Sequence, residues 1–205
     1  MDEVGRGALF GPVCAGAVIM NPQRIPSGIN DSKTLSPRQR SKLADDIREA
    51  AEASAVAFVD ASTIDRINIL EATRRAMVLA VEKLETRPDF LLSDGDMVVP
   101  IPLPQQSIVG GDRRSLSIAA ASILAKVARD RLIVNLDARY PGYDLRNNMG
   151  YGTRKHREAL MRLGPTPLHR ASFRGVCGLN SADPGSGVDP EEGTYLKQTL
   201  RLRKP

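Results

Sequence analysis

The chain is poor in aromatic residues. Its 205 residues include four Phe, four Tyr and no Trp. Proteins that bind single-stranded nucleic acid by stacking successive bases need a broad platform of aromatic side chains. The composition therefore argues against base stacking and favours contact with a backbone or with duplex shape, should the partner be a nucleic acid.

Cysteine and long apolar stretches are also scarce. Cys14 and Cys177 are the two cysteines, a number typical of reduced thiols in a cytosolic protein and not of a disulfide framework. The longest apolar stretch, residues 8–20, contains Pro12 and is shorter than the ~20 residues of a membrane helix. The chain opens with two acids in place of the basic segment of a signal peptide. We therefore expect a soluble, cytoplasmic protein.

Positive charge exceeds negative charge. The formal net charge is +5 and the isoelectric point is about 9.5, which favours a polyanionic partner. A surplus of this size also occurs in many proteins that bind no nucleic acid. The length suits one domain with a substantial core.

The order of apolar and amphipathic segments predicts a mixed α/β domain. Ser36 with Pro37, and Thr153, supply signals for the beginning of a helix. The small residues 119–122 predict close packing of their helix against the sheet. We predict strands at 11–20, 54–60, 89–93 and 106–109, and helices at 37–53, 63–85, 115–139 and 153–163.

Composition changes near residue 178. From there the chain is rich in Asn, Ser, Asp, Pro and Gly, which is typical of a flexible linker. The last residues are basic. We predict a domain at 1–177 followed by a flexible or weakly helical basic tail at 178–205.

Four acidic residues lie in short loops that contain Gly or Ser: Asp2, Glu3, Asp94 and Asp112. Gathered at strand ends, these carboxylates would repel one another unless a divalent cation held them, and oxygen ligands suit Mg²⁺ or Mn²⁺. In a basic chain this indicates phosphodiester chemistry. Each acid alone has a plainer explanation: a solvated terminus for Asp2 and Glu3, a turn for Asp94, and a helix cap for Asp112.

Several sequence blocks occur together in a fixed order: DEVGRGALFGPVCAGAVI, NDSKTLS, SDG, GGDRRSLSIAAASILAKVARDR, GYGT and HRASF. Together they resemble the type 2 ribonuclease H family, ribonuclease HII, from residue 1 to about 176. The resemblance implies a ribonuclease H-like mixed sheet flanked by helices, with a C-terminal helical segment.

The function that the resemblance implies is an endonuclease using two Mn²⁺ or Mg²⁺ ions. It would hydrolyse the RNA strand of RNA/DNA hybrids and nick duplex DNA 5′ of an embedded ribonucleotide, leaving 3′-hydroxyl and 5′-phosphate ends. Such an enzyme removes RNA primers and misincorporated ribonucleotides during replication and repair. We expect it to act as a monomer.

The resemblance also assigns roles to particular residues. The catalytic and metal-binding residues would be Asp2, Glu3, Asp94 and Asp112. The backbone of Gly5, Arg6 and Gly7 would read the ribose 2′-hydroxyl, the group that distinguishes RNA from DNA, and Tyr151 would pack on the sugar just downstream. Near the bound phosphates would lie Lys33, His169, Arg170 and Ser172.

The chain also departs from the family pattern. The family often has Lys at the position of Gly110 and a His-Lys pair at Asn148-Met149, so two phosphate contacts would be lost. A strand usually leads into the acidic pair, whereas here only Met1 precedes it. Two alternatives therefore stay open: a hybrid-binding protein with catalysis impaired by a shortened N-terminus, and another nuclease of the same fold, such as a resolvase or transposase-type enzyme.

Overall fold

The protein is described from a computed structural model that covers residues 1–29 and 35–179. Lys33 and residues 180–205 lie outside the described residues. The division into a domain at 1–177 and a basic tail therefore stays a prediction.

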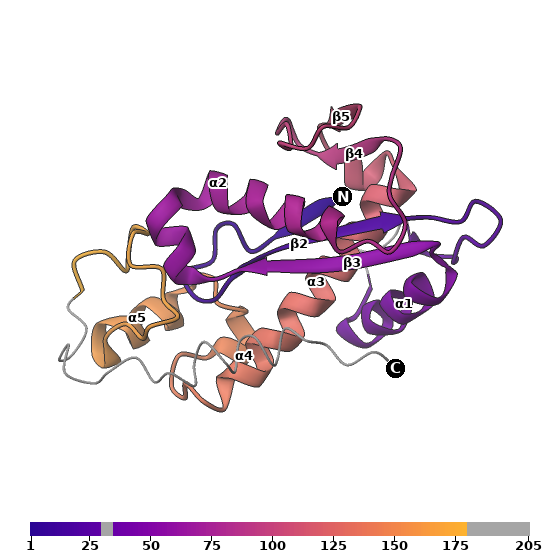
Figure 1. Cartoon of the computed structure of the whole chain (residues 1–205). Coiled ribbons are helices and arrows are strands. Elements are labelled where there is room, and N and C mark those ends of the chain that lie inside the picture. Colours follow the sequence, from indigo (N-terminus) through magenta and orange to yellow (C-terminus); the bar gives the residue numbers. More distant parts are fainter. Residues whose placement is uncertain (30–34, 180–205) are drawn as a thin grey trace.

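The longest strands form an antiparallel sheet. β2 (Val13–Ile19) pairs with β1 (Asp2–Val4) on one side and with β3 (Ala53–Val59) on the other. β4 (Leu91–Asp94) and β5 (Gln105–Ile108) form a separate parallel pair, seen beside the N-terminus in Figure 1.

Met1 joins the two sheets. Its amino group donates to the Leu92 carbonyl at 2.7 Å, and its carbonyl accepts from the Asp94 amide at 3.2 Å. This is the hydrogen-bond pattern of a parallel bridge. It brings the beginning of β1, with Asp2 and Glu3, beside the end of β4, which carries Asp94.

Helices cover both faces of the antiparallel sheet (Figure 1). α2 (Ala61–Glu82) packs on one face, and α1 (Pro37–Ala50) and α3 (Leu116–Asp137) pack on the other. Alternate residues of β2 serve the two faces, because side chains along a strand point to opposite sides. Val13, Ala15 and Ala17 share a core with α2, whereas the thiol of Cys14 lies 3.5 Å from the Ala125 carbonyl of α3.

α3 lies close against the sheet at Gly16. A Cβ atom added to Gly16 would lie 2.4 Å from the Ala121 carbonyl oxygen, so a larger residue would push the helix away. The close packing predicted from the small residues 119–122 is confirmed.

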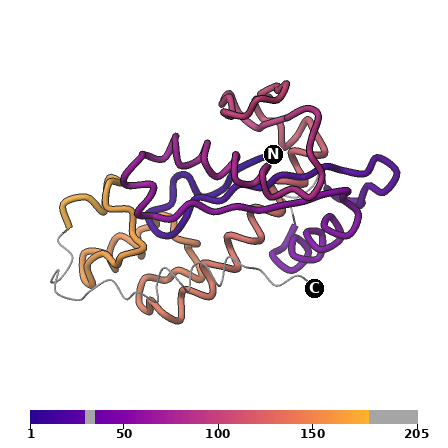
Figure 2. The backbone as a smooth tube through the Cα atoms, viewed as in Figure 1, coloured from indigo at the N-terminus to yellow at the C-terminus, as the bar shows by residue number. Residues whose placement is uncertain are grey.

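Two short helices complete the end of the molecule away from β4 and β5, as the tube in Figure 2 shows. α4 (Leu145–Asn148) and α5 (Arg154–Leu163) follow α3 along the chain. They enclose a second apolar core with the C-terminal part of α3, which includes Phe10, Ile133, Leu136, Leu145 and Leu160. This core supports the loops that carry Tyr151 and His169.

All eight predicted strands and helices are present, with ends shifted by a few residues. Ser36 begins α1 with a capping box, its hydroxyl and backbone both bonded to Gln39. β1, α4 and the short 3₁₀ turn η2 (Gly111–Arg113) were not predicted. In the part of the chain that the structure describes, no helix is both long and apolar enough to cross a membrane.

The prediction of one continuous helix at 63–85 was wrong in one respect. α2 is kinked at Asn68, whose φ of 67° is left-handed. The Asn68 side-chain oxygen accepts hydrogen bonds from the amides of Leu70 and Glu71, so it caps the part of the helix that follows. Apolar periodicity did not reveal this break, since the apolar residues keep their spacing across it.

Candidate active site

Three of the four predicted carboxylates, Asp2, Glu3 and Asp94, influence one another at the junction of the two sheets, and we call them the acidic cluster. Asp2 is only 6% exposed. Burial raises its pKa to about 6; a hydrogen bond from the Ser122 hydroxyl lowers the pKa, and the charges of Glu3 and Asp94 raise it further. The cluster is therefore a place where negative charge is costly.

Glu3 leaves β1 on the face opposite to Asp2, because neighbouring strand residues alternate. In the register with β2, Asp2 lies opposite Gly16 and Glu3 opposite Ala15. Burial raises the pKa of Glu3, and the guanidinium of Arg6, 3.2 Å away, opposes that shift. The charge of Asp94 raises it further, so Asp94 acts on both residues.

Asp112 is connected to the cluster through the backbone. The amide of Gly111 donates to Oδ1 of Asp94 at 2.6 Å, which fixes η2 against the end of β4. A Cβ on Gly111 would lie 2.5 Å from the side chain of Ile118, so this approach requires glycine. Asp112 is the next residue and is half-buried. The structure thus brings the four predicted acids to one end of the sheet.

The chemistry of these residues fits a divalent cation, although their side chains do not converge on one point. Among residues 1–29 and 35–179, no three Asp, Glu, His or Cys side chains lie close enough together to hold a metal ion. Carboxylate oxygens are the ligands that Mg²⁺ and Mn²⁺ prefer. A bound cation would also stabilise the buried negative charge of Asp2 and Glu3, whose pKa values are raised mainly by burial and further by neighbouring carboxylates. The residue types therefore fit, and binding would require side chains to reorient.

The predicted Gly5-Arg6-Gly7 turn follows directly after β1. Gly5 has a φ of 89°, and a Cβ there would lie 2.1 Å from Nε of Arg129. Gly7 is exposed, and a Cβ added to it would meet nothing within 4 Å. Gly5 is thus required by conformation and packing, whereas Gly7 leaves an open backbone surface beside the acidic cluster.

The buried side chain of Arg129 packs against this turn, and its role was not predicted from the sequence. It is fully buried in α3, and its guanidinium donates to three carbonyls, those of Pro12 at 3.0 Å, Met149 at 2.8 Å and Phe10 at 3.0 Å. The guanidinium also lies 5.5 Å from the centre of the Tyr151 ring. One side chain therefore links the glycine turn to the loop before Tyr151.

Tyr151 is held beside the glycine turn by backbone pairing. An isolated antiparallel bridge joins Tyr151 to Ala8, and the Gly150 carbonyl accepts from the amides of Leu9 and Phe10 at 2.8 and 3.1 Å. A Cβ on Gly150 would lie 2.6 Å from the Phe10 carbonyl. Tyr151 is half-buried and lies at the same end of the sheet as the turn.

The residues predicted near bound phosphates contact protein groups instead of standing free. His169 is 3% exposed and Arg170 is fully buried. Arg170 donates to the carbonyls of Gly11 at 3.0 Å and Arg6 at 2.8 Å, and burial lowers its pKa to about 9. Its Nη2 has no hydrogen-bond partner within the described residues. A contact of either residue with substrate stays a prediction.

Ser172 is tied to α2. Its backbone amide and its hydroxyl both donate to Asp65, and the Ala171 amide donates to the other oxygen of the same carboxylate at 2.8 Å. Sequence reasoning missed Asp65, since a solvent-facing acid in a helix gives no signal of a partner more than a hundred residues away.

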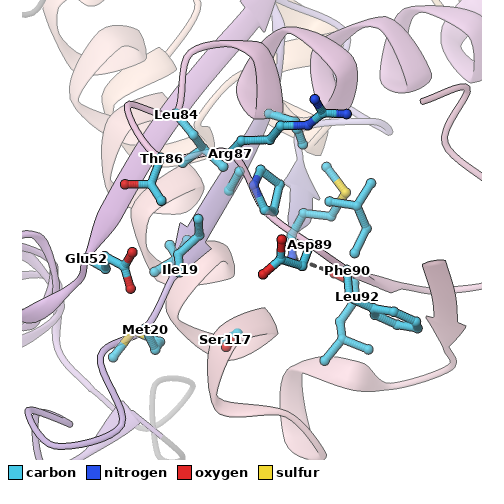
Figure 3. Close-up of a pocket in the computed structure, with 16 residues that line it drawn as sticks. Ile19, Met20, Glu52, Leu84, Thr86, Arg87, Asp89, Phe90, Leu92 and Ser117 are labelled. Atoms are coloured by element: carbon cyan, nitrogen blue, oxygen red, sulfur yellow. Dashed lines mark hydrogen bonds between the residues drawn. The ribbon is translucent and has the colours of Figure 1, made fainter. Parts of the chain in front are cut away.

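A cavity of about 350 Å³ lies between the end of β2 and the beginning of β4 (Figure 3). Glu52, Thr86, Arg87 and Asp89 line it together with the apolar side chains of Ile19 and Phe90. None of the four predicted acids contributes to its wall. The cavity therefore borders the junction of the two sheets through Met1 and Leu92 but does not contain the acidic cluster.

Comparisons with known proteins agree on one family. The ribonuclease HII family matches residues 1–176. Ribonuclease HII of Syntrophotalea carbinolica is 51% identical over 176 residues, covering 86% of this chain and 84% of the relative. That of Acaryochloris marina is 53% identical over 178 residues, covering 84% and 90%. The crystal structure of ribonuclease H2 from Pyrococcus horikoshii is 27% identical with a TM-score of 0.73, covering 85% of this chain and 92% of that one. The predicted ribonuclease H-like fold is confirmed.

Proposed function

The chain belongs to the ribonuclease HII family and is thereby a ribonuclease H, and from this premise we propose its substrate and its site. It hydrolyses the RNA strand of RNA/DNA hybrids and nicks duplex DNA 5′ of an embedded ribonucleotide. The observation that carries this proposal is the continuity of the acidic cluster, the glycine turn and Tyr151. Glu3 is paired with Arg6 of the turn at 3.2 Å, and Ala8 after the turn is bridged to Tyr151.

Two divalent cations, Mg²⁺ or Mn²⁺, would be held by Asp2, Glu3, Asp94 and Asp112. When bound, they would supply Lewis-acid activation of the attacking water and stabilisation of the departing 3′-oxygen. The surroundings of Asp2 favour the binding of a cation. Asp2 is buried, and no basic side chain is paired with it in the described structure, whereas Glu3 shares its charge with Arg6.

The glycine turn and Tyr151 would recognise the ribonucleotide. Gly7 exposes its backbone without a side chain, so a ribose 2′-hydroxyl can approach the peptide groups of the turn. Arg170 holds the turn itself by donating to the Arg6 carbonyl, and Arg129 holds the segment that follows by donating to the Phe10 carbonyl. The turn is therefore rigid before substrate binds, which reduces the entropy cost of recognition.

Basic side chains beside the acids would contact phosphates. Arg113 and Arg114 are exposed and follow Asp112 directly. Exposed arginines so close to the carboxylates can hold the substrate backbone without entering the cluster. Arg113 and Arg114 would supply positive charge in place of the basic residues that the family often has at Gly110 and Asn148-Met149.

The direct test replaces Asp94 with Asn and Asp96 with Asn as a matched control. Asn retains an oxygen that can accept from the Gly111 amide, so Asp94→Asn keeps the fold while removing the charge. Asp96 lies two residues away and is exposed. Nicking of a duplex with one ribonucleotide is measured in Mg²⁺ or Mn²⁺, with an all-DNA duplex beside it.

We expect Asp94→Asn to abolish nicking with little loss of substrate affinity, since affinity rests mainly on phosphate contacts. Asp96→Asn should nick at the wild-type rate. Near-normal turnover of Asp94→Asn would remove Asp94 from the site. A wild-type protein that binds the hybrid and does not cut it would favour the hybrid-binding alternative.

A further inference from the structure

The two histidines of the chain are buried one against the other close to Tyr151. His156 lies in α5 and is fully buried, and His169 is 3% exposed. Their Nε2 atoms are 3.1 Å apart. His169 also packs edge-on against Phe10, with ring centres 4.9 Å apart. Both rings are shielded from solvent in this structure.

The partners of the outer ring nitrogens fix the direction of the hydrogen bonds. The Thr166 amide can only donate, and it lies 2.9 Å from Nδ1 of His169, so that nitrogen is unprotonated. The Tyr151 carbonyl can only accept, and it lies 2.9 Å from Nδ1 of His156, so that nitrogen carries a proton.

The contact between the rings then follows. A neutral His169 with a free Nδ1 carries its proton on Nε2, and a neutral His156 with a protonated Nδ1 has a free Nε2. His169 therefore donates to His156 across the 3.1 Å contact. Burial lowers the pKa of both rings, in agreement with two neutral side chains. The chain of bonds runs one way, from the Thr166 amide through both rings to the Tyr151 carbonyl.

We propose that His156 and His169 form a positioning relay for Tyr151 in the site proposed above. Residues 8–10, which follow the glycine turn, pair with two segments, one carrying Tyr151 and the other carrying His169. The relay connects these two segments. His169 is bridged to Phe10 and Tyr151 to Ala8, so the relay ties the outer segments together across that stretch. His156 thus acts on substrate choice through Tyr151 and touches no substrate itself. The proposal depends on the proposed function for its substrate.

The test compares two replacements of His156. In His156→Asn the amide nitrogen takes the place of Nδ1 and can still donate to the Tyr151 carbonyl. In His156→Leu no donor remains, and the apolar bulk is retained. Each variant is assayed on a duplex with one ribonucleotide and on an RNA/DNA hybrid, at a temperature where thermal unfolding shows it to be folded.

We expect His156→Leu to lower kcat/KM on the single-ribonucleotide duplex by about tenfold relative to the hybrid, the factor that one hydrogen bond supplies. His156→Asn should restore part of that ratio, because it keeps the donor to the Tyr151 carbonyl but offers no acceptor to Nε2 of His169. Equal losses on both substrates, or no advantage of Asn over Leu, would overturn the relay and leave a purely structural histidine pair.

A second measurement needs neither a stable variant nor activity. NMR of the ring nitrogens in wild-type protein reports which nitrogen of each histidine carries the proton, and only two residues contribute. We expect the Nε2–H form for His169 and the Nδ1–H form for His156 at neutral pH. Any other pair of forms refutes the relay. An inactive wild type with these forms would count against the proposed function alone, while an unchanged substrate ratio in an active enzyme would count against the relay alone.

Discussion

Replacing Asp2 with Asn should make the metal-free protein more stable at neutral pH while destroying its activity. Asn has almost the shape of Asp, and its oxygen can still accept from the Glu3 amide, as Oδ1 of Asp2 does at 2.7 Å. The substitution therefore removes one buried charge and little else. A residue kept in spite of such a cost is expected at a functional site.

The size of the effect follows from the pKa of Asp2, which rises from 3.8 to about 6 on folding. Well below pH 3.8 the carboxyl is protonated in both states and costs nothing. As the pH rises toward 6, the unfolded chain releases its proton while the folded protein keeps it, so the unfolding free energy falls. Above about pH 6 the full penalty is present, roughly 3 kcal/mol from these two pKa values.

Thermal unfolding in the presence of a chelator measures this difference. At about pH 8, Asp2→Asn should melt on the order of 5–10 °C above wild type, and at about pH 4.5 the gain should shrink to a minor part of that. Asp96→Asn, which removes an exposed charge, is the control and should melt close to wild type. Added Mn²⁺ should raise the melting temperature of wild type more than that of Asp2→Asn, because the cation binds the folded cluster.

A gain that is equal at both pH values would show that charge is not its cause. A loss of stability at pH 8 would contradict the buried-charge argument directly. An Asp2→Asn enzyme that still nicks a single-ribonucleotide duplex at the wild-type rate would remove Asp2 from the catalytic residues.

Two further predictions concern the glycine turn and its neighbour. Gly5→Ala should lower the melting temperature clearly, because a Cβ would lie 2.1 Å from the buried Arg129 side chain at a left-handed φ. A Cβ at Gly7 has open space, so Gly7→Ala should melt like wild type. Equal melting temperatures of the two variants would contradict this packing. Tyr151→Ala should depress nicking at a single embedded ribonucleotide more than cleavage of a continuous hybrid. If the variant cuts both substrates at wild-type rates, the junction-reading role is wrong.

The strands and the helix caps were predictable because local residues determine them, whereas the approach of Asp94 to the acidic pair was expected from strand ends and from the family resemblance. Ser36 and Gln39 form the capping box that their spacing indicates, and Asp94 ends a strand beside the acidic pair. Arg129 and Arg170 were not predictable in their roles. Arginine is usually exposed, and these two are buried against carbonyls of residues far away in the chain. A backbone carbonyl leaves no mark in a sequence, so its partner cannot be read from it.

That kind of contact has an evolutionary consequence. Arg129 binds the carbonyls of Phe10, Pro12 and Met149, and every amino acid offers the same carbonyl. A substitution at these three positions therefore leaves the acceptors of Arg129 in place, although the buried side chain of Phe10 is also fixed by its packing. Selection can alter the half-buried side chain of Met149, while one guanidinium keeps the backbone of the loop in position. The departure of this chain at Met149 is of the kind that such an anchor tolerates. Asn148 differs, because its side chain donates to the Tyr143 carbonyl at 2.7 Å and accepts from the Gly150 amide at 2.8 Å.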